Sequence, residues 1–521
     1  MDPTRPDELS KALATPVSRR KALKALAAIA GASGLAALPN SLEIAGLDPG
    51  ARAALAKEVQ DELASGESKL TGRLVFPNSP NYESARLLWA RQFSKFPLVI
   101  VFCQDVQDVV NAISWCREHD VAFRARSGRH ALEGWSSLDG GVVIDVSDMN
   151  QIHVDESAGV ATVQTGTTQG AVVKALGKRG YTIPTGGEVT PGIAGVTLGG
   201  GIGRLVRSMG LACDHLVGVE MVVPSGKQGA RVIRADESHN ADLLWASRGG
   251  GGGNFGIATS FTFKIRPIST VTMYEVTWER GWPHMSELLS VWQELAPSAP
   301  DRLGSAFTAA AEPEFFAHGK TDGSVVSNGF FLGSEARLRR LLQPLLGIGK
   351  PKVTIKTMPY LDAWLQFALP NEPPHKDKFS SVWVYNSLPP KAIETIRSFL
   401  ADAPNPEANI WCLSWGGAVG RIPTDATAFF HRKPRYYIEW DVPWKNAREE
   451  KEAIAWIERF RVAMGPYVKG SYINVPDSSI NDLRTYYGDN LARLQEVKRK
   501  YDPQNVFHFE QSIPPGGGKS R

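Results

Sequence analysis

The glycine-rich stretch from Gly186 to Gly203 holds eight glycines in eighteen residues and constrains the fold of this chain more than any other feature. Glycine has no Cβ, so its backbone can turn freely and approach neighbouring groups closely. A segment this poor in side chains can lie directly against a flat ring system. No predicted strand with G-x-G-x-x-G spacing precedes Gly199 to Gly203, which disfavours a dinucleotide fold with a nicotinamide site.

A short basic turn over Arg124 to His130 is the second constraint. It follows a predicted strand, Val121 to Phe123, and offers consecutive backbone N–H groups, arginines and one imidazole. Amides that point into one concavity bind phosphate, and arginine adds forked donors that suit a pyrophosphate. Taken alone, these residues also fit a solvated surface turn with a structural histidine.

The first half of the chain alternates strands and helices. Leu98 to Phe102 is β-rich, Val106 to His119 has helical spacing with its apolar residues on one side, and the strand ending at Phe123 follows. This order predicts a βαβ unit whose last strand delivers the basic turn. Further strands are predicted over 141–146, 160–164, 216–223, 229–233 and 259–265, and helices over 168–179 and 241–248.

A different pattern begins at Pro267, where long helical segments are separated by several short strands. The predicted helices cover 283–296 and 334–346, and the predicted strands cover 305–310, 329–332, 410–415 and 436–440. This arrangement predicts one antiparallel sheet with helices on a face, which is an α+β domain.

Four motifs in a fixed order carry a family resemblance: Arg126-Ser127-Gly128-Arg129-His130, 195–203, 244–257 and 501–507. With them the sequence resembles the berberine-bridge-enzyme-like branch of the vanillyl-alcohol-oxidase flavoproteins. The resemblance implies an α+β fold with a two-part PCMH-type FAD-binding domain (80–267) and an α+β substrate domain with an antiparallel sheet (268–469). A berberine-bridge-like return segment (470–515) is expected to pack on the FAD domain.

The resemblance also implies which residues bind FAD. The expected contacts are Arg126, Ser127, Gly128, Arg129, His130, Gly187, Thr190, Gly192, Gly195, Gly199, Gly200, Gly201, Gly203, Gly256, Ile257, Asn505 and Phe507.

His130 resembles the family histidine that is bonded to the 8α-methyl carbon of the flavin, a bond that raises the flavin's potential. Many relatives add a second covalent bond through a cysteine at the place occupied here by Glu188, so we expect attachment through His130 only. Pro191 occupies the position that gates dioxygen in the family, which leaves dioxygen and another electron acceptor as alternatives.

Two residues are candidate catalytic bases. Tyr472, in Tyr472-Ile473-Asn474, resembles the family's Tyr-x-Asn segment beside the flavin, and its phenol needs help to accept a proton because its usual pKa is about 10. Glu439 alternates with apolar residues on a predicted strand, where an aromatic cleft would raise its pKa; a solvated strand face is the alternative. His431 and Lys378 are weaker candidates and are expected at the surface.

The N-terminal region, residues 1–45, has the pattern of a twin-arginine export signal and its linker. Arg19 and Arg20 precede the apolar run Ala25 to Leu38, which is short for a membrane span. An amphipathic helix is the alternative, although the run lacks a polar face. No later apolar stretch approaches a transmembrane length, so we expect an exported, periplasmic or extracellular protein without a membrane anchor in its mature form.

Composition excludes several other classes of protein. The net charge of +4 is small for 521 residues and gives no basis for nucleic-acid binding. The four cysteines lack C-x-x-C spacing, so no metal site is predicted, and disulfides stay open for an exported chain. Nothing in the sequence indicates an oligomeric state.

Together these features predict an exported FAD-dependent oxidoreductase. It would oxidise an alcohol or sugar-type CH–OH group of a small-molecule substrate by hydride transfer to flavin N5, with dioxygen as acceptor. Two alternatives remain: an FAD-linked dehydrogenase that uses another acceptor, and an exported, non-catalytic binding protein that contains FAD.

Overall fold

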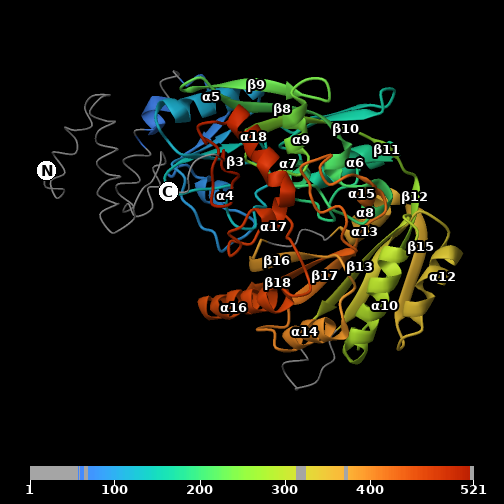
Figure 1. Ribbon diagram of the computed structural model, residues 1–521. Helices are drawn as coiled ribbons and strands as arrows, with labels where there is room; N and C mark the ends of the chain where they lie inside the picture. Colours follow the sequence, from blue (N-terminus) through green and yellow to red (C-terminus); the bar gives the residue numbers. More distant parts are fainter. Residues whose placement is uncertain (1–56, 58, 64–67, 312–323, 369–373, 517–521) are drawn as a thin grey trace.

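The computed structural model describes residues 57–516, except for 58, 64–67, 312–323 and 369–373. The predicted export signal lies outside these residues. The described chain has three main sheets of four, five and seven strands and one two-stranded ladder. The two smaller main sheets lie in the upper half of Figure 1 and the seven-stranded sheet in the lower half. The chain therefore has the expected α+β fold, with a two-part first unit and a separate antiparallel unit.

The four-stranded sheet has the order β1-β2-β4-β3, with β2 and β3 both parallel to β4. Its elements, with the helices that connect them, are β1 (Arg73–Val75), α4 (Tyr82–Arg86), β2 (Val99–Phe102), α5 (Val106–Glu118), β3 (Phe123–Arg126) and β4 (Val142–Asp145). The βαβ unit is confirmed, but its last strand begins at Phe123 instead of Val121 and ends at Arg126. Because β1 pairs with β2, the sheet also begins before residue 80.

The five-stranded sheet is antiparallel and has the order β5-β6-β10-β8-β9. Its strands are β5 (Ile152–Asp155), β6 (Val160–Gln164), β8 (Leu216–Ser225), β9 (Gly229–Ala235) and β10 (Ile257–Lys264). The remaining elements of this region are α6 (Gln169–Gly177), β7 (Tyr181–Thr182), α7 (Ile193–Leu198), α8 (Val206–Met209), the 3₁₀ turn η1 (Ala212–His215), α9 (Ala241–Ser247) and β11 (Arg266–Pro267). The predicted strand pair over 216–233 is confirmed.

The seven-stranded sheet is antiparallel throughout, with the order β15-β12-β14-β13-β17-β18-β16. Its strands are β12 (Thr270–Trp278), β13 (Leu303–Ala310), β14 (Val325–Phe331), β15 (Lys352–Pro359), β16 (Lys376–Val384), β17 (Asn409–Ser414) and β18 (Tyr436–Trp444). This confirms the prediction of one antiparallel sheet and extends it.

Long helices cover the outer face of this sheet in Figure 1, namely α10 (Met285–Ser298), α12 (Glu335–Leu346), α14 (Pro390–Ala401) and α16 (Ala447–Met464). A large apolar core fills the space between these helices and the sheet, with Trp292 and Trp456 fully buried in it. Short elements complete the region: η2 (Trp282–His284), α13 (Tyr360–Phe367) and α15 (Ala418–Arg421). The opposite face of the sheet is left to form the site described below.

The chain returns to the first unit after α16. Its last elements are α17 (Arg484–Tyr487), η3 (Gly488–Asn490) and α18 (Leu491–Tyr501), drawn in red beside α9 in Figure 1. Tyr487 Oη donates to the Gly250 carbonyl at 3.0 Å, and the Ile513 N–H donates to Asn254 Oδ1 at 2.8 Å. These contacts tie the end of the chain to the glycine-rich loop after α9.

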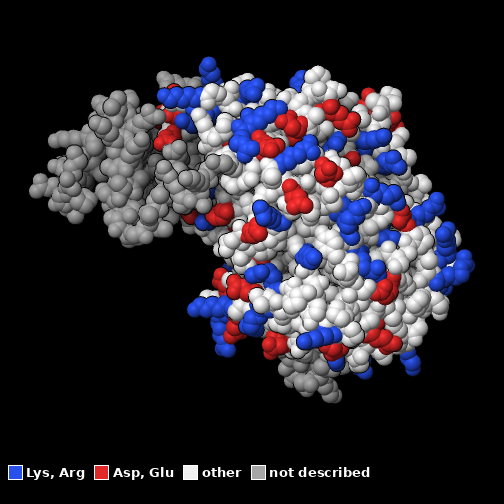
Figure 2. All heavy atoms as spheres, in the orientation of Figure 1, with Lys and Arg blue, Asp and Glu red and all other residues white. Residues whose placement is uncertain are grey.

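Positive and negative side chains are interspersed over the face of the molecule in Figure 2. All four cysteines are buried and free. Among the described helices, none combines the length and the apolar character that crossing a membrane requires.

Candidate functional site

Strand β3 ends in the basic turn, which lies against the loop that precedes α7. Arg129 has a φ of +64°, and its carbonyl accepts the Trp89 N–H at 3.0 Å. Within the described part of the chain, the N–H groups of residues 127–130 donate to no protein acceptor, so they are available to an anion. A Cβ added at Gly128 would lie 2.0 Å from the Gly192 nitrogen, so the two loops meet backbone to backbone.

Replacing Gly128 with Ala is expected to lower the free energy of unfolding by about 1–3 kcal/mol, because the added methyl group forces the two loops apart. Urea unfolding measures this loss. Gly229→Ala is the matched control, since the nearest atom to its added Cβ is the Ser225 carbonyl oxygen at 3.5 Å. Equal losses in both variants would contradict the close contact.

Arg126 and α7 add two features that fit a bound cofactor. The Arg126 side chain is fully buried and its Nε donates to Asp145 Oδ2 at 2.5 Å, but its two terminal nitrogens have no hydrogen-bond partner among the described residues. Buried polar groups are nearly always satisfied, so these donors indicate a missing polar partner. A Cβ added at Gly195 meets no atom within 4 Å, so α7 presents bare backbone to open space. Free amides, a guanidinium with two unsatisfied terminal nitrogens and a bare backbone suit the pyrophosphate and rings of FAD.

His130 lies at the end of the turn as a half-buried, neutral imidazole. Its ring stacks on Trp89, with centroids 5.3 Å apart and an angle of 22° between the planes. Burial lowers the pKa of His130 from 6.5 to about 4. A neutral imidazole has a free nitrogen lone pair at physiological pH, as nucleophilic attack requires.

The glycine stretch contacts the C-terminal segment. A Cβ at Gly199 would overlap Asn474, and one at Gly200, whose φ is +132°, would meet Phe429 and Tyr472. The Gly201 N–H donates to Tyr472 Oη at 3.0 Å. Glycine is required here because these side chains occupy the space next to the backbone.

Aromatic side chains form a chamber between the seven-stranded sheet and the glycine stretch. We call this group the aromatic chamber; it contains Trp383, Trp415, Phe429, Tyr437 and Tyr472. Trp383 is at its centre, with its ring centroid 4.7 Å from Trp415 and 4.8 Å from Tyr437. The five rings are buried against one another and keep water out of the space between the sheet and the glycine stretch.

Glu439 projects from β18 into this chamber. Tyr437 Oη donates to Glu439 Oε2 at 2.7 Å. Burial and, to a smaller degree, the charge of Glu188 raise the pKa of Glu439 to about 7, although the Tyr437 hydrogen bond lowers it. Glu439 is half-buried on its strand, and with this pKa its carboxyl can exchange a proton near neutral pH.

Tyr472 is buried in the chamber as a protonated phenol. Its oxygen accepts hydrogen bonds from Gly201 N and from Asn474 Nδ2, each at 3.0 Å. These two bonds favour the phenolate, but burial outweighs them and raises the pKa of Tyr472 well above 10. Of the two candidate bases, Glu439 is the one that loses its proton near pH 7.

The other predicted FAD contacts lie in several places. Thr190 is exposed, and Gly187 lies beside Arg204. A Cβ at Gly256 would meet the Val222 carbonyl at 2.4 Å, and one at Gly203 would meet the Thr185 carbonyl at 2.0 Å.

Ile257 and Phe507 belong to the apolar core beneath β3, where Phe507 meets Phe123 edge to face at 5.3 Å. Asn505 has a φ of +52°, and its buried Oδ1 has no hydrogen-bond partner among the described residues. Ser127 Oγ donates to the Thr165 carbonyl at 2.7 Å.

Two surface predictions are wrong. His431 is buried between Tyr385, whose hydroxyl is 3.0 Å from its Nδ1, and the ring of Trp383, on which it stacks. The Lys378 side chain is almost buried and forms ion pairs with Glu133 and Asp477. Sequence reasoning also missed Trp89 and Glu133, which have no motif around them and acquire their partners only in the folded chain.

The buried His431 predicts a loss of stability in acid. Burial lowers its pKa from 6.5 to about 4. Between these two pH values the His431 imidazole binds a proton in the unfolded chain but not in the folded chain. The free energy of unfolding should fall toward pH 4 by at most about 1.4 kcal/mol per pH unit from this residue. Urea unfolding at pH 7 and pH 5 tests this, and His431→Gln should fall less steeply than the parent. Parallel slopes would contradict it.

Comparison with known proteins agrees with this geometry. Residues 97–229 match the family described as "FAD binding domain", and residues 471–514 match "Berberine and berberine like". The chain is 47% identical over 459 residues to the FAD-linked oxidoreductase YvdP of Bacillus subtilis (strain 168), covering 86% of this chain and 99% of that protein. It is 30% identical over 466 residues to tetrahydroberberine oxidase of Berberis wilsoniae, covering 80% and 85%.

Comparison with solved structures also finds a berberine-bridge-enzyme-like protein. The BBE-like 1 protein of Physcomitrella patens superposes with a TM-score of 0.80 at 27% identity, covering 88% of this chain and 100% of that one. The chain belongs to the berberine bridge enzyme-like FAD-linked oxidoreductases. It is accordingly an FAD-dependent oxidoreductase enzyme, and its proposed chemistry follows from the site.

Proposed function

We propose that this enzyme is exported and oxidises an alcohol or sugar-type CH–OH group of a small molecule, with dioxygen as electron acceptor. The observation that carries the chemistry is the Glu439 carboxyl in the aromatic chamber, where its pKa is raised to about 7. A group with this pKa is ionised for half of the molecules at neutral pH and can take the hydroxyl proton. The pattern of residues 1–45 supports export through a twin-arginine signal.

FAD would be held by the free amides of 127–130, by Arg126 and by the bare backbone of α7. When bound, FAD supplies the hydride acceptor for the oxidation. His130 would attach it covalently, since its imidazole is neutral and held flat against Trp89. Glu188 stands at the place of the second attachment in relatives and carries no thiol, so a single attachment is proposed.

The two candidate bases would then have separate tasks. Glu439 would accept the substrate proton, and the protonated Tyr472 would orient the substrate oxygen by donating a hydrogen bond. The chamber rings would exclude water and pack on the substrate's carbon skeleton. We propose that the chain is divided into an FAD-binding part (80–267), a substrate part (268–469) and a return segment (470–515).

The test combines flavin reduction with peroxide detection. The purified holoenzyme is mixed without oxygen with a panel of alcohols and oligosaccharides, and loss of flavin absorbance identifies a substrate. Oxygen is then admitted. Stoichiometric peroxide supports an oxidase, consistent with the oxidase named among the relatives. Reoxidation only by an added dye would favour the dehydrogenase.

Failure of every compound containing a CH–OH group, together with reduction by a different class of donor, would overturn the proposed substrate class. A flavin that no donor reduces, although dithionite does, would favour the binding protein. Tyr472→Phe is a second check: it should slow flavin reduction while leaving the pH dependence set by Glu439 in place.

A further inference from the structure

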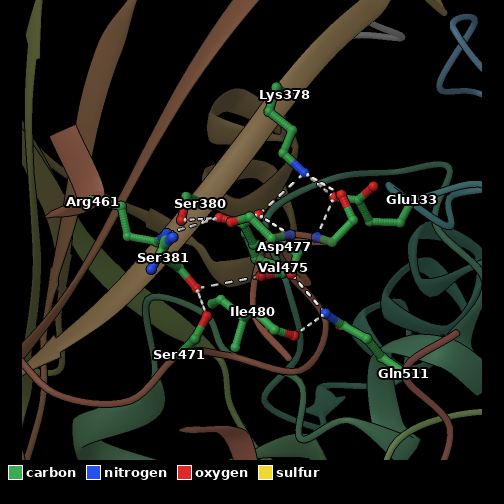
Figure 3. A network of polar contacts seen from close by, with 12 residues as sticks. Glu133, Lys378, Ser380, Ser381, Arg461, Ser471, Val475, Asp477, Ile480 and Gln511 are labelled. Atoms are coloured by element: carbon green, nitrogen blue, oxygen red, sulfur yellow. Dashed lines mark hydrogen bonds and ion pairs between the residues drawn. The ribbon is translucent and has the colours of Figure 1, made fainter. Parts of the chain in front are cut away.

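A buried cluster of charges outside the aromatic chamber joins three distant parts of the chain (Figure 3). Lys378 of β16 forms an ion pair with Glu133, and its Nζ lies 3.3 Å from Asp477 Oδ1. The side chains of Glu133, Lys378 and Asp477 are 6%, 12% and 0% exposed. Solvent screens charges this deeply buried only weakly, so each one depends on its partners.

Asp477 has several further partners, among them Arg461 of α16, whose Nε lies 3.7 Å from Asp477 Oδ2 (Figure 3). Its Oδ2 accepts from Ser380 Oγ at 2.7 Å, and its Oδ1 accepts from the backbone N–H and the hydroxyl of Ser479 at 2.9 and 2.7 Å. Gln511 Nε2 donates to the Asp477 carbonyl at 2.7 Å. Burial raises the pKa of Asp477, but Lys378 and these hydrogen bonds outweigh it and lower the pKa below its usual value. The carboxylate is therefore ionised and fixed in place.

The same strand holds the residues around Tyr472. Ser381, which follows Ser380 on β16, accepts the Tyr472 N–H at 3.0 Å and lies 2.9 Å from Ser471 Oγ. At the other end of the cluster, Glu133 Oε1 accepts the Ser478 N–H at 3.0 Å. Glu133 follows His130, the last residue of the basic turn, by three positions, and Asp477 follows Tyr472 by five. Lys378 therefore connects the basic turn to the segment that carries Tyr472.

Apolar packing does not fix this junction by itself. A cavity of about 320 Å³ lies between β16, the end of α16 and the loop 479–485. It is lined by Ser381, Arg461, Lys469, Ser479, Asn481 and Thr485, among others. The pocket opens to solvent, so on this side the 471–477 segment is held by polar contacts, while Tyr472 and Val475 pack in the apolar cluster on the other.

We propose that Glu133, Lys378 and Asp477 form an interdomain clasp in which Lys378 is a positioning residue. The clasp sets the distance between the turn that ends at His130 and the segment that carries Tyr472, so the two sides of the site move together. Assigning these sides to flavin and substrate rests on the proposed function, but the mechanical coupling does not.

Hydrogen–deuterium exchange of the holoenzyme tests the coupling through residues that the changed side chain does not touch. Asp477→Asn should speed exchange of the Trp89 N–H, which donates to the Arg129 carbonyl of the basic turn, about tenfold. Glu133→Gln should do the same for the hydrogen-bonded N–H groups of residues 471–475. Glu452→Gln is the control, since it removes one charge from an exposed pair with Arg448 on α16. Faster exchange confined to the changed residue's own contacts, or the same pattern in Glu452→Gln, would overturn the clasp.

Lys378 itself supplies the second measurement. Lys378→Met should speed exchange on both sides and lower the fraction of flavin that stays with acid-precipitated protein, and Lys378→Arg should restore both. If Lys378→Met fails to fold, Glu133→Gln and Asp477→Asn still decide the coupling. A parent enzyme without acid-stable flavin would remove the attachment hypothesis, and the exchange data would still support or overturn the clasp.

Discussion

His130→Ala is expected to bind FAD without any covalent attachment, so that acid precipitation releases all of its flavin into the supernatant. The reason is chemical: His130 has the neutral imidazole at the end of the amide turn, and Glu188 cannot replace it as a thiol would. The bound flavin should also have a lower reduction potential, because the electron-withdrawing bond is lost. The flavin content of the acid pellet and a reductive titration measure the two effects.

A matched variant separates attachment from general damage. His153→Ala removes an exposed histidine from β5 and should keep the flavin in the pellet. If His130→Ala retained acid-stable flavin, the attachment site would lie elsewhere. Loss of FAD altogether, with an intact thermal transition, would indicate that the imidazole contributes binding as well as attachment.

Glu439→Gln is expected to slow flavin reduction by about 10²–10⁴-fold, because the amide retains the shape of the side chain but cannot accept the proton. In the parent enzyme the rate should rise with pH through an inflection near 7, as the raised pKa of Glu439 is passed and the carboxylate forms. Rapid mixing with substrate in the absence of oxygen measures the rate at each pH. The variant should lack this inflection.

Two neighbours provide the controls. Tyr437→Phe removes the hydrogen bond that lowers the Glu439 pKa, so the inflection should move to higher pH. Asp441→Asn changes a carboxylate two residues further along β18 and should leave the inflection in place. An unchanged profile in Glu439→Gln would exclude this residue as the base.

The basic turn and the antiparallel sheet were predictable because their signals are local. The Arg126 to His130 motif contains its own amides and imidazole, and alternating apolar residues indicate strands wherever they occur. Most predicted elements are shifted by a few residues, such as β3, which continues to Arg126 because Arg126 still pairs with Asp145 on β4. Strands β12, β15 and β16 were not predicted. Short-range periodicity places the centre of a strand better than its end.

The raised pKa of Glu439 and the buried ion pairs of Lys378 could not be predicted from local patterns. The raised pKa of Glu439 depends on burial among rings from β16, β18 and two later loops, and Lys378 acquires partners from opposite ends of the chain. Trp89 has no pattern that anticipates its stacking on His130. Such properties arise from contacts between distant segments. A sequence pattern can therefore suggest candidate residues, but it cannot rank them.

The return of the last segment to the first unit has a consequence for biosynthesis. Tyr472, Asp477 and the residues around Asn505 are translated after all the strands of the three main sheets. During synthesis the basic turn and four of the five rings of the aromatic chamber are therefore made before Tyr472, the fifth ring. A chain truncated before Tyr472 would therefore contain the basic turn and the seven-stranded sheet without the segment that joins them.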